Sequence, residues 1–294
     1  MADLRKRLAT NVAGNFFVDA TCINCDACRQ LAPKSFKESG DYSTVVHQPD
    51  GDEELDQAYQ ALLACPVGSI GAERGDKLRL KKAMGRFPIL LDDGVYYNGF
   101  HSAKSFGGNS YFICHPAGNW LIDSPRYVRP LTDAFEEKGG LRYIFLTHED
   151  DVADASLYAK HFGATRIIHR ADAAASPVAE WIVEGEAPIP VSDAFQMIPV
   201  PGHTEGSIAL LYDRRFLFSG DHLWWERDLG ELGAPEQLVW NRRRLIESIA
   251  KLRDHSFEWL LPGHGDRVHL TPAEMTAHLE RLLGYRIGMR RRVY

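Results

Sequence analysis

The stretch TCINCDAC at residues 21–28 places three cysteines in one short loop, with two residues between each cysteine and the next. A fourth cysteine, Cys65, stands alone further along the chain and is followed by Pro66. A cubane iron–sulfur cluster binds three thiolates of one tight loop and a fourth from elsewhere, and its last ligand commonly precedes a proline. The spacing therefore predicts a 4Fe–4S cluster held by Cys22, Cys25, Cys28 and Cys65.

A structural zinc site with four cysteine ligands is the alternative interpretation. Zinc sites usually combine two pairs of closely spaced cysteines, whereas here three ligands share one loop and one is isolated, which favours the cluster. We expect no secretory signal in the N-terminal residues, so metal ligation is also a better explanation of these cysteines than a set of disulfides. The fifth cysteine, Cys114, lies in an apolar run and is expected to be a buried strand residue.

Over residues 16–70 the chain resembles single-cluster bacterial ferredoxins. It shares the Ala-Pro and the Phe after the third cysteine, and the Cys-Pro-x-x-x-Ile at the end. The resemblance implies a small α+β ferredoxin-like domain, which we place at residues 1–75, and a cluster that carries one electron at a time. Cys25 is present where some relatives have Asp, which favours four irons over three.

Length, composition and charge limit the remaining possibilities. The chain of 294 residues can form one large domain and one small one, and none of its apolar runs approaches the eighteen or so residues that span a bilayer. We therefore expect a cytoplasmic protein that does not enter a membrane. Residues 22–76 carry ten acidic side chains against four basic ones, which argues against nucleic acid and suits a basic redox partner docking near the ferredoxin domain. A solvated acidic face explains the charge equally well, and a homo-oligomer stays open.

The chain beyond the cysteines begins with a basic stretch punctuated by Gly and Pro, which predicts a linker at residues 76–90. Residues 91–294 then alternate strand-like and helix-like segments, with early hairpins followed by strand–helix units. This order predicts a layered α/β sandwich.

Four imidazole or carboxylate side chains stand where a predicted strand meets a loop: His148 in LTH, His203 in PGHTEGS, Asp221 in SGD and His264 in LPGHG. Strand ends are where a rigid sheet presents ligands to a shared cleft. One such histidine is ordinary, but four junctions in this order predict a metal site.

This series of motifs resembles the metallo-β-lactamase superfamily over residues 95–275, which implies an αββα sandwich with the metal site at one edge of its two sheets. The family's second motif is His-x-His-x-Asp-His, whereas residues 148–154 read HEDDVAD. Asp150 stands in place of the second His, and residues 152–153 replace the Asp-His pair that holds the second metal. A two-residue slip puts Asp154 at the Asp position, but the final His is lost on either alignment.

The set that remains, His148, His203 and Asp221, has the two imidazoles and one carboxylate typical of non-haem iron(II) sites with open positions. The resemblance supplies two precedents. The persulfide dioxygenase branch binds one iron at these three positions, and flavodiiron proteins use a carboxylate at the position of Asp150. We therefore expect one redox-capable metal, iron or else zinc, with Asp150 as a fourth ligand. His264, at a position where the family binds its second metal, is also retained.

Three functions remain open at this point. The first is an iron–sulfur redox protein whose second domain carries out an electron-linked reaction. The second is a zinc-dependent hydrolase, in which the metal would lower the pKa of bound water. The third is a non-catalytic electron-transfer or structural protein whose second site binds nothing. The sequence assigns neither catalytic residues nor a substrate.

Overall fold

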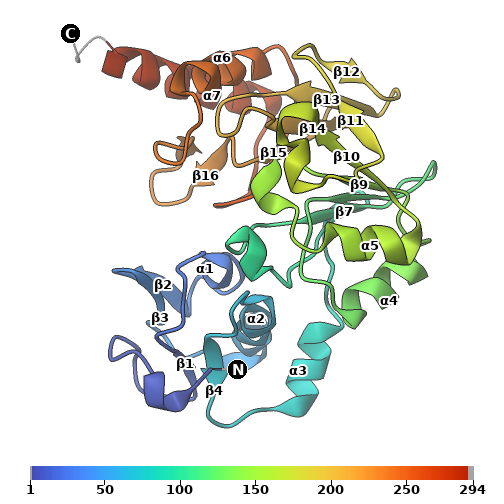
Figure 1. Ribbon diagram of the computed structural model, residues 1–294. Coiled ribbons are helices and arrows are strands. Elements are labelled where there is room, and N and C mark those ends of the chain that lie inside the picture. The colour runs from blue at the N-terminus through green and yellow to red at the C-terminus, as the bar shows by residue number, and fades with distance from the viewer. Residues whose placement is uncertain (1, 291–294) are drawn as a thin grey trace. The chain divides into compact units, whose positions relative to one another are not determined.

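A computed structural model describes residues 2–290, with side chains as far as residue 284, and its elements are labelled in Figure 1. The chain forms two compact units. The first unit comprises Met1–Arg142 and Ala153–Ala164, and the second comprises Tyr143–Val152 and Thr165–Tyr294.

The first unit begins with a small module that carries the four predicted cluster cysteines. Two antiparallel strand pairs and two helices build it, and Phe16 meets Tyr59 edge-on in its core, with ring centroids 5.2 Å apart. A short 3-10 helix, η1, precedes them. The elements are η1 (Leu4–Lys6), β1 (Phe16–Val18), α1 (Ala27–Leu31), β2 (Phe36–Ser39), β3 (Tyr42–Val45), α2 (Gly51–Ala64) and β4 (Ile70–Ala72).

Helix α3 (Lys77–Met84) lies within residues 76–90, which we expected to be a linker. Asp76 caps the helix, because its side chain accepts hydrogen bonds from two backbone N–H groups of the first turn. Lys82 and Arg86 then pair with Asp56 of α2, at 2.7 and 3.1 Å, and Figure 1 shows the two helices side by side. The stretch therefore packs against the ferredoxin-like module, while the predicted domain boundaries remain a prediction.

The rest of the first unit is an antiparallel four-stranded meander with two helices. Phe112 of the meander stacks on Phe135 of α4 at a centroid distance of 4.7 Å. Cys114 was expected to be buried in a strand, but that strand ends at Ile113, so Cys114 begins the turn and is exposed. The elements are β5 (Ile89–Asp92), β6 (Val95–Tyr97), η2 (Ala103–Ser105), β7 (Tyr111–Ile113), β8 (Trp120–Ile122), α4 (Arg129–Glu137) and α5 (Ala155–Phe162).

The second unit contains a parallel group of three strands and a six-stranded sheet. The parallel group is β9 (Tyr143–Phe145), β10 (Thr165–His169) and β11 (Trp181–Val183), with η3 (Glu149–Asp151) and η4 (Arg170–Ala175) following β9 and β10. The larger sheet has the order β12 (Ile189–Pro190), β13 (Phe195–Pro199), β14 (Ile208–Tyr212), β15 (Phe216–Gly220), β18 (Trp259–Pro262) and β19 (Val268–His269).

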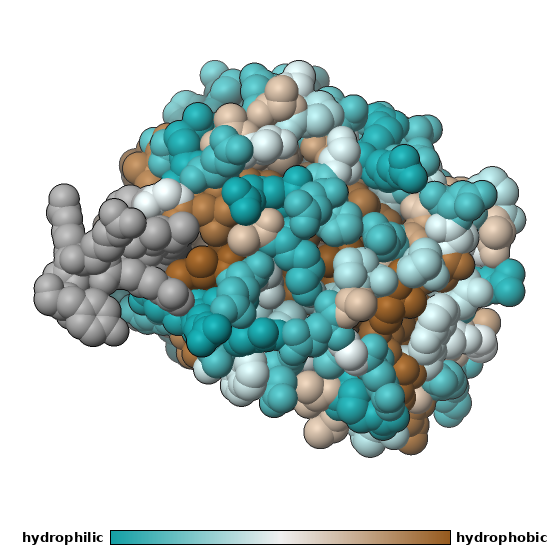
Figure 2. Space-filling view, turned by 90° about the horizontal axis from the view of Figure 1, so that it is seen from above, coloured by the Kyte–Doolittle hydropathy of each residue, from teal (hydrophilic) through white to brown (hydrophobic). Residues whose placement is uncertain are grey.

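Helices α6 (Arg242–Leu252) and α7 (Pro272–Arg290) lie together in Figure 1 and share one apolar core with the six-stranded sheet. A separate hairpin is formed by β16 (Trp224–Glu226) and β17 (Glu231–Gly233). The face drawn in Figure 2 is mixed, with apolar areas separated by hydrophilic side chains. Among the described residues, no helix combines the length and the apolar character needed to cross a bilayer.

Candidate metal centres

The four predicted cluster cysteines line one small apolar cavity of the first unit, together with Val18, Ile23, Ala27, Ser43, Pro66, Val67, Ser69 and Ile70. Cys28 lies in α1 and Cys65 caps the C-terminal end of α2. Between the loop cysteines, Asn24 and Asp26 adopt left-handed backbone conformations, with φ of 57° and 64°. Such residues coil the chain tightly, which lets successive thiols face the same cavity.

Hydrogen-bond donors surround the sulfur atoms of this cavity. The backbone N–H groups of Asn24 and Ser43 each lie 3.4 Å from Cys22 Sγ, and the backbone N and Oγ of Ser69 both lie 3.3 Å from Cys65 Sγ. Burial raises the pKa of Cys28 to about 12, so the bare thiol stays protonated at neutral pH. Bound iron would hold such a group as a thiolate, and the donors would stabilise its charge. The cavity therefore fits the cluster that the spacing predicts.

The second candidate centre lies wholly within the second unit. His148 follows β9, His203 lies between β13 and β14, and Asp221 follows β15. One ligand atom of each lies within 4.8 Å of the others, and the Nε2 atoms of both histidines are 3.7 Å from Asp221 Oδ2. The structure thus brings together the three residues that the sequence singled out.

Buried atoms at this centre lack hydrogen-bond partners among the described residues. They include His148 Nε2, both ring nitrogens of His203 and Asp221 Oδ1. Leaving a buried polar atom unsatisfied costs about 1–3 kcal/mol, and a cation would supply the missing interaction. Burial lowers the pKa of His148, which leaves the ring neutral with a lone pair for a metal. Asp150 Oδ2 lies 3.4 Å from His203 Nε2, where a fourth ligand is expected.

Asp151 is a candidate ligand that we missed in the sequence. The side chains of Asp151, Asp221 and His264 form a second group of potential ligands within 4.8 Å, so Asp221 belongs to both groups. A side-chain carbon added at Gly263 would lie 2.5 Å from Asp221 Oδ1 and 2.8 Å from Asp151 Oδ2. The absence of a side chain there therefore leaves room for both carboxylates. The signal was the run of three acids after His148, which forms the 3-10 turn η3.

Asp154, the alternative to Val152 at the second-metal position, has other partners. Its carboxylate accepts a hydrogen bond from Lys104 Nζ at 2.6 Å and one from Tyr127 N at 2.9 Å, all within the first unit. The acid that lies with Asp221 and His264 is thus Asp151. In the alignment without a gap, the family's metal-binding Asp falls on Val152, one position later.

Asp172 connects the two backbone segments that carry the histidine ligands. Its Oδ2 accepts hydrogen bonds from Thr204 Oγ1 at 2.6 Å and from Glu149 N at 3.1 Å, and its Oδ1 accepts one from Gly206 N at 2.8 Å. Asp172 is buried in η4, and nothing in its local sequence marks it as part of a site. It ties the chain after His148 to the chain after His203.

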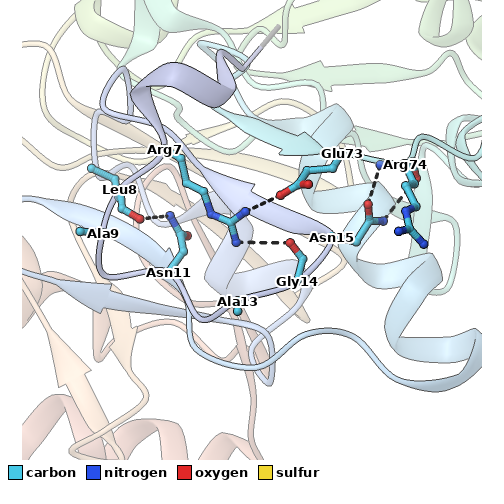
Figure 3. Close-up of a pocket in the computed structure, with 9 residues that line it drawn as sticks. All are labelled: Arg7, Leu8, Ala9, Asn11, Ala13, Gly14, Asn15, Glu73 and Arg74. Atoms are coloured by element: carbon cyan, nitrogen blue, oxygen red, sulfur yellow. Dashed lines mark hydrogen bonds and ion pairs between the residues drawn. The ribbon is translucent and has the colours of Figure 1, made fainter.

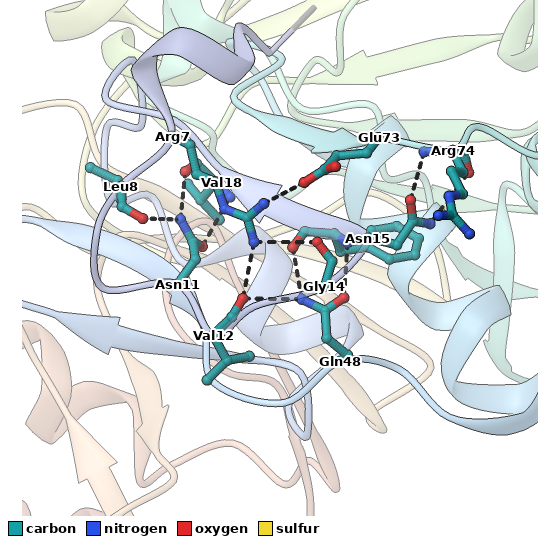
Figure 4. A network of polar contacts seen from close by, with 11 residues as sticks. Arg7, Leu8, Asn11, Val12, Gly14, Asn15, Val18, Gln48, Glu73 and Arg74 are labelled. Carbon is teal, nitrogen blue, oxygen red and sulfur yellow. Dashed lines mark hydrogen bonds and ion pairs between the residues drawn. The ribbon is translucent and has the colours of Figure 1, made fainter.

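The N-terminal module also contains a surface pocket of roughly 730 Å³, drawn in Figure 3. The guanidinium of Arg7 pairs with Glu73 at 2.5 Å and donates to the carbonyls of Val12 and Gly14. Figure 4 shows the surrounding network, in which Gln48 also takes part. Because these contacts stabilise the N-terminal loop itself, we assign the pocket no ligand.

Comparisons with known proteins agree with the two halves of the chain. Residues 18–72 match the family described as the 4Fe-4S single cluster domain of ferredoxin I. A hydroxyacylglutathione hydrolase of Pectobacterium atrosepticum is 29% identical over 149 residues, which cover 49% of this chain and 57% of the relative. A protein of the same name from Acidiphilium cryptum is 30% identical over 119 residues, covering 39% and 49%. The chain spans about half the length of the curated relatives it matches.

Solved structures show the fold. A metallo-beta-lactamase family protein from Thermus thermophilus superposes with a TM-score of 0.50 at 16% identity, covering 68% of this chain and 81% of that one. VMB-1 superposes with a TM-score of 0.51 at 14% identity, covering 68% and 96%. The expected fold class, a small N-terminal domain followed by a sheet-rich α/β sandwich, is confirmed. The chain thus joins a single-cluster ferredoxin domain to a domain with the metallo-β-lactamase fold.

Proposed function

We propose that the protein is a metal-dependent oxidoreductase whose cluster passes single electrons to or from a reaction at the second centre. The observation that carries the proposal is the donor set of that centre. Asp150 stands where an imidazole is expected, and Asp151 adds a further carboxylate to the group of Asp221 and His264. Imidazole and carboxylate together suit iron and manganese, whereas zinc sites are typically richer in imidazole or thiolate.

Bound iron would supply one-electron chemistry and open coordination positions. The protein's own residues prepare the site. Thr147 Oγ1 lies 2.9 Å from His148 Nδ1, which orients the ring so that Nε2 faces Asp221. The two groups of potential ligands, one with His148 and His203 and the other with Asp151 and His264, share Asp221. We therefore expect up to two metal ions at this centre, whereas the sequence predicts one.

The electron donor or acceptor would be a protein with a basic surface. Residues 22–76 carry the excess of acidic side chains, which would attract such a partner to the ferredoxin domain. Surface electrostatics of this kind weaken as salt is added. We therefore expect the rate of cluster reduction by the partner to fall with ionic strength.

Metal analysis of anaerobically purified protein tests the proposal. We expect the four irons of the cluster and, in addition, one or two irons per chain. Cys65→Ser would disrupt the cluster and leave the additional iron in place, which separates the two pools. Zinc in place of the additional iron, or no metal beyond the cluster, would contradict the proposal.

Hydrolysis is the second candidate, because four curated relatives are named hydroxyacylglutathione hydrolase. A thioester assay of the same preparation, loaded in parallel with iron and with zinc, distinguishes the two functions. The oxidoreductase proposal predicts no thioester turnover in the iron-loaded protein, and rapid turnover only with zinc would favour the hydrolase.

A further inference from the structure

A turn outside the ferredoxin-like module lies against the wall of the cluster cavity. Gly107 has a φ of +88°, and a side-chain carbon added there would lie 2.6 Å from Cys25 Cβ, 2.8 Å from Cys25 Sγ and 3.3 Å from Pro66 Cγ. The backbone of Gly107 therefore lies against two residues of the cavity wall. We call residues 102–108 the cluster lid.

The His101 ring holds the cluster lid through hydrogen bonds to two of its carbonyl groups. Its Nδ1 lies 2.6 Å from the carbonyl oxygen of Gly107 and 2.9 Å from that of Gly108. Both neighbours are acceptors, so Nδ1 carries the proton, and Nε2 then accepts a hydrogen bond from Tyr97 Oη at 2.6 Å. The ring is buried, and these hydrogen bonds connect the turn to Tyr97 of β6.

His101 and Arg126 are each hydrogen-bonded to the end of α2, directly before the cluster ligand Cys65. His101 N donates to the carbonyl of Ala64 at 3.1 Å, and Arg126 Nη2 donates to the carbonyl of Leu63 at 3.0 Å. The first bond joins two backbone atoms and the second runs from a guanidinium to a backbone carbonyl, so both link the chain next to the lid or bonded to it to the cysteine-bearing module. The residue that holds the lid is therefore also bonded to the residue that precedes the fourth cluster ligand.

We propose that the cluster lid, held by His101, shields the cluster from water and oxidants and keeps its reduction potential low. The proposal rests on the predicted cluster and not on the chemistry of the second centre. Reduction adds a negative charge to the cluster, and water stabilises that charge better than a protein wall does. Solvent exposure is accordingly one of the factors that set cluster potentials. Opening the lid should raise the potential and expose the cluster to attack.

Substitution of His101 tests the lid in the full-length, cluster-loaded protein. His101→Leu removes both hydrogen bonds to the lid carbonyls, whereas His101→Asn can place an amide N–H near the position of Nδ1. For His101→Leu we expect a positive shift of the midpoint potential in an EPR-monitored redox titration. We also expect several-fold faster loss of iron to a chelator in air. His101→Asn should lie close to the wild type in both measurements.

His161→Leu is the matched control, because His161 also contacts a tyrosine hydroxyl and a second oxygen, at 2.7 Å each, in the same unit. It should leave potential and iron loss unchanged. If His101→Leu does not hold a cluster, Tyr97→Phe replaces it, since this change removes the hydrogen bond to Nε2 but keeps both bonds to the lid carbonyls, and it predicts smaller shifts in the same direction. Unchanged potential and iron loss in the cluster-loaded His101 or Tyr97 variant would overturn the proposal, as would equal changes in His161→Leu.

Discussion

Replacing Asp172 by Asn should weaken metal binding at the second centre without removing any ligand. The carboxylate accepts three hydrogen bonds, two at Oδ2 and one at Oδ1. An amide offers one oxygen, so at best it keeps the two bonds from Thr204 and Glu149, and its NH2 group then faces the N–H of Gly206. Hydrogen bonds to charged groups contribute about 1.5–3 kcal/mol each. Loss of one bond therefore predicts a cost of about 2 kcal/mol.

Part of this cost should appear as metal affinity, because Asp172 holds the segments that carry His148 and His203. Changes to residues that orient metal ligands typically weaken affinity 10- to 100-fold, which corresponds to about 1.4–2.7 kcal/mol. The assay is anaerobic competition for iron(II) against a chromophoric chelator. The absorbance of the cluster in the other unit serves as an internal reference and should not change.

Glu180→Gln is the matched control for a general loss of stability. Glu180 is a similarly engaged acid of the second unit, bonded to the backbone N of Arg166 at 2.8 Å and to its guanidinium at 2.6 Å. Loss of the Glu180 carboxylate should lower the free energy of unfolding and leave the iron affinity of the second centre unchanged. Unaltered affinity in Asp172→Asn, or an equal fall in Glu180→Gln, would refute the positioning role.

Two further predictions concern single side chains of the two centres. Where the second centre of the wild type holds two ions, Asp151→Asn should remove one of them and leave the group with His148 loaded, as measured by metal analysis; a content that stays at two ions would exclude Asp151 as a required ligand. Ser69→Ala removes a hydroxyl 3.3 Å from Cys65 Sγ, so the reduced cluster loses a stabilising donor and its potential should become more negative in a redox titration. A potential equal to that of the wild type would show that this hydroxyl does not donate to the sulfur.

The parts of the molecule that local patterns encode were predictable. The cysteine spacing alone identified four side chains that line one cavity, because three of them share a single loop. Helix α6 was likewise predictable from the pattern of its own residues. Its apolar positions recur at helical spacing, and Asn241 caps its first turn by accepting from Arg244 N.

Features that depend on contacts distant in sequence were not predictable. Helix α3 reads as a basic linker because four of its eight residues are Lys or Arg, and it is stabilised by Asp56, which lies 26 residues before Lys82. Asp172 and His101 carry no motif, and their roles follow from the carbonyls and N–H groups that the fold brings to them. The motif around His148 led us to the position occupied by Val152, whereas the 3-10 turn η3 presents the preceding Asp151.

Asp150→His offers the sharpest test of why the centre should select iron. The carboxylate of Asp150 lies 3.4 Å from His203 Nε2 and 3.8 Å from His148 Nε2, and its side chain is 65% exposed, so an imidazole fits without repacking the core. The change creates a centre with three imidazoles and one shared carboxylate, which suits zinc. Protein produced with equal iron and zinc should therefore shift its second-centre content toward zinc, and its thioester turnover should rise. The 4Fe–4S spectrum, governed by cysteines in the other unit, should stay the same. If the ratio of iron to zinc does not move, the carboxylate at position 150 is not what determines the metal, and the main support for a redox function is lost.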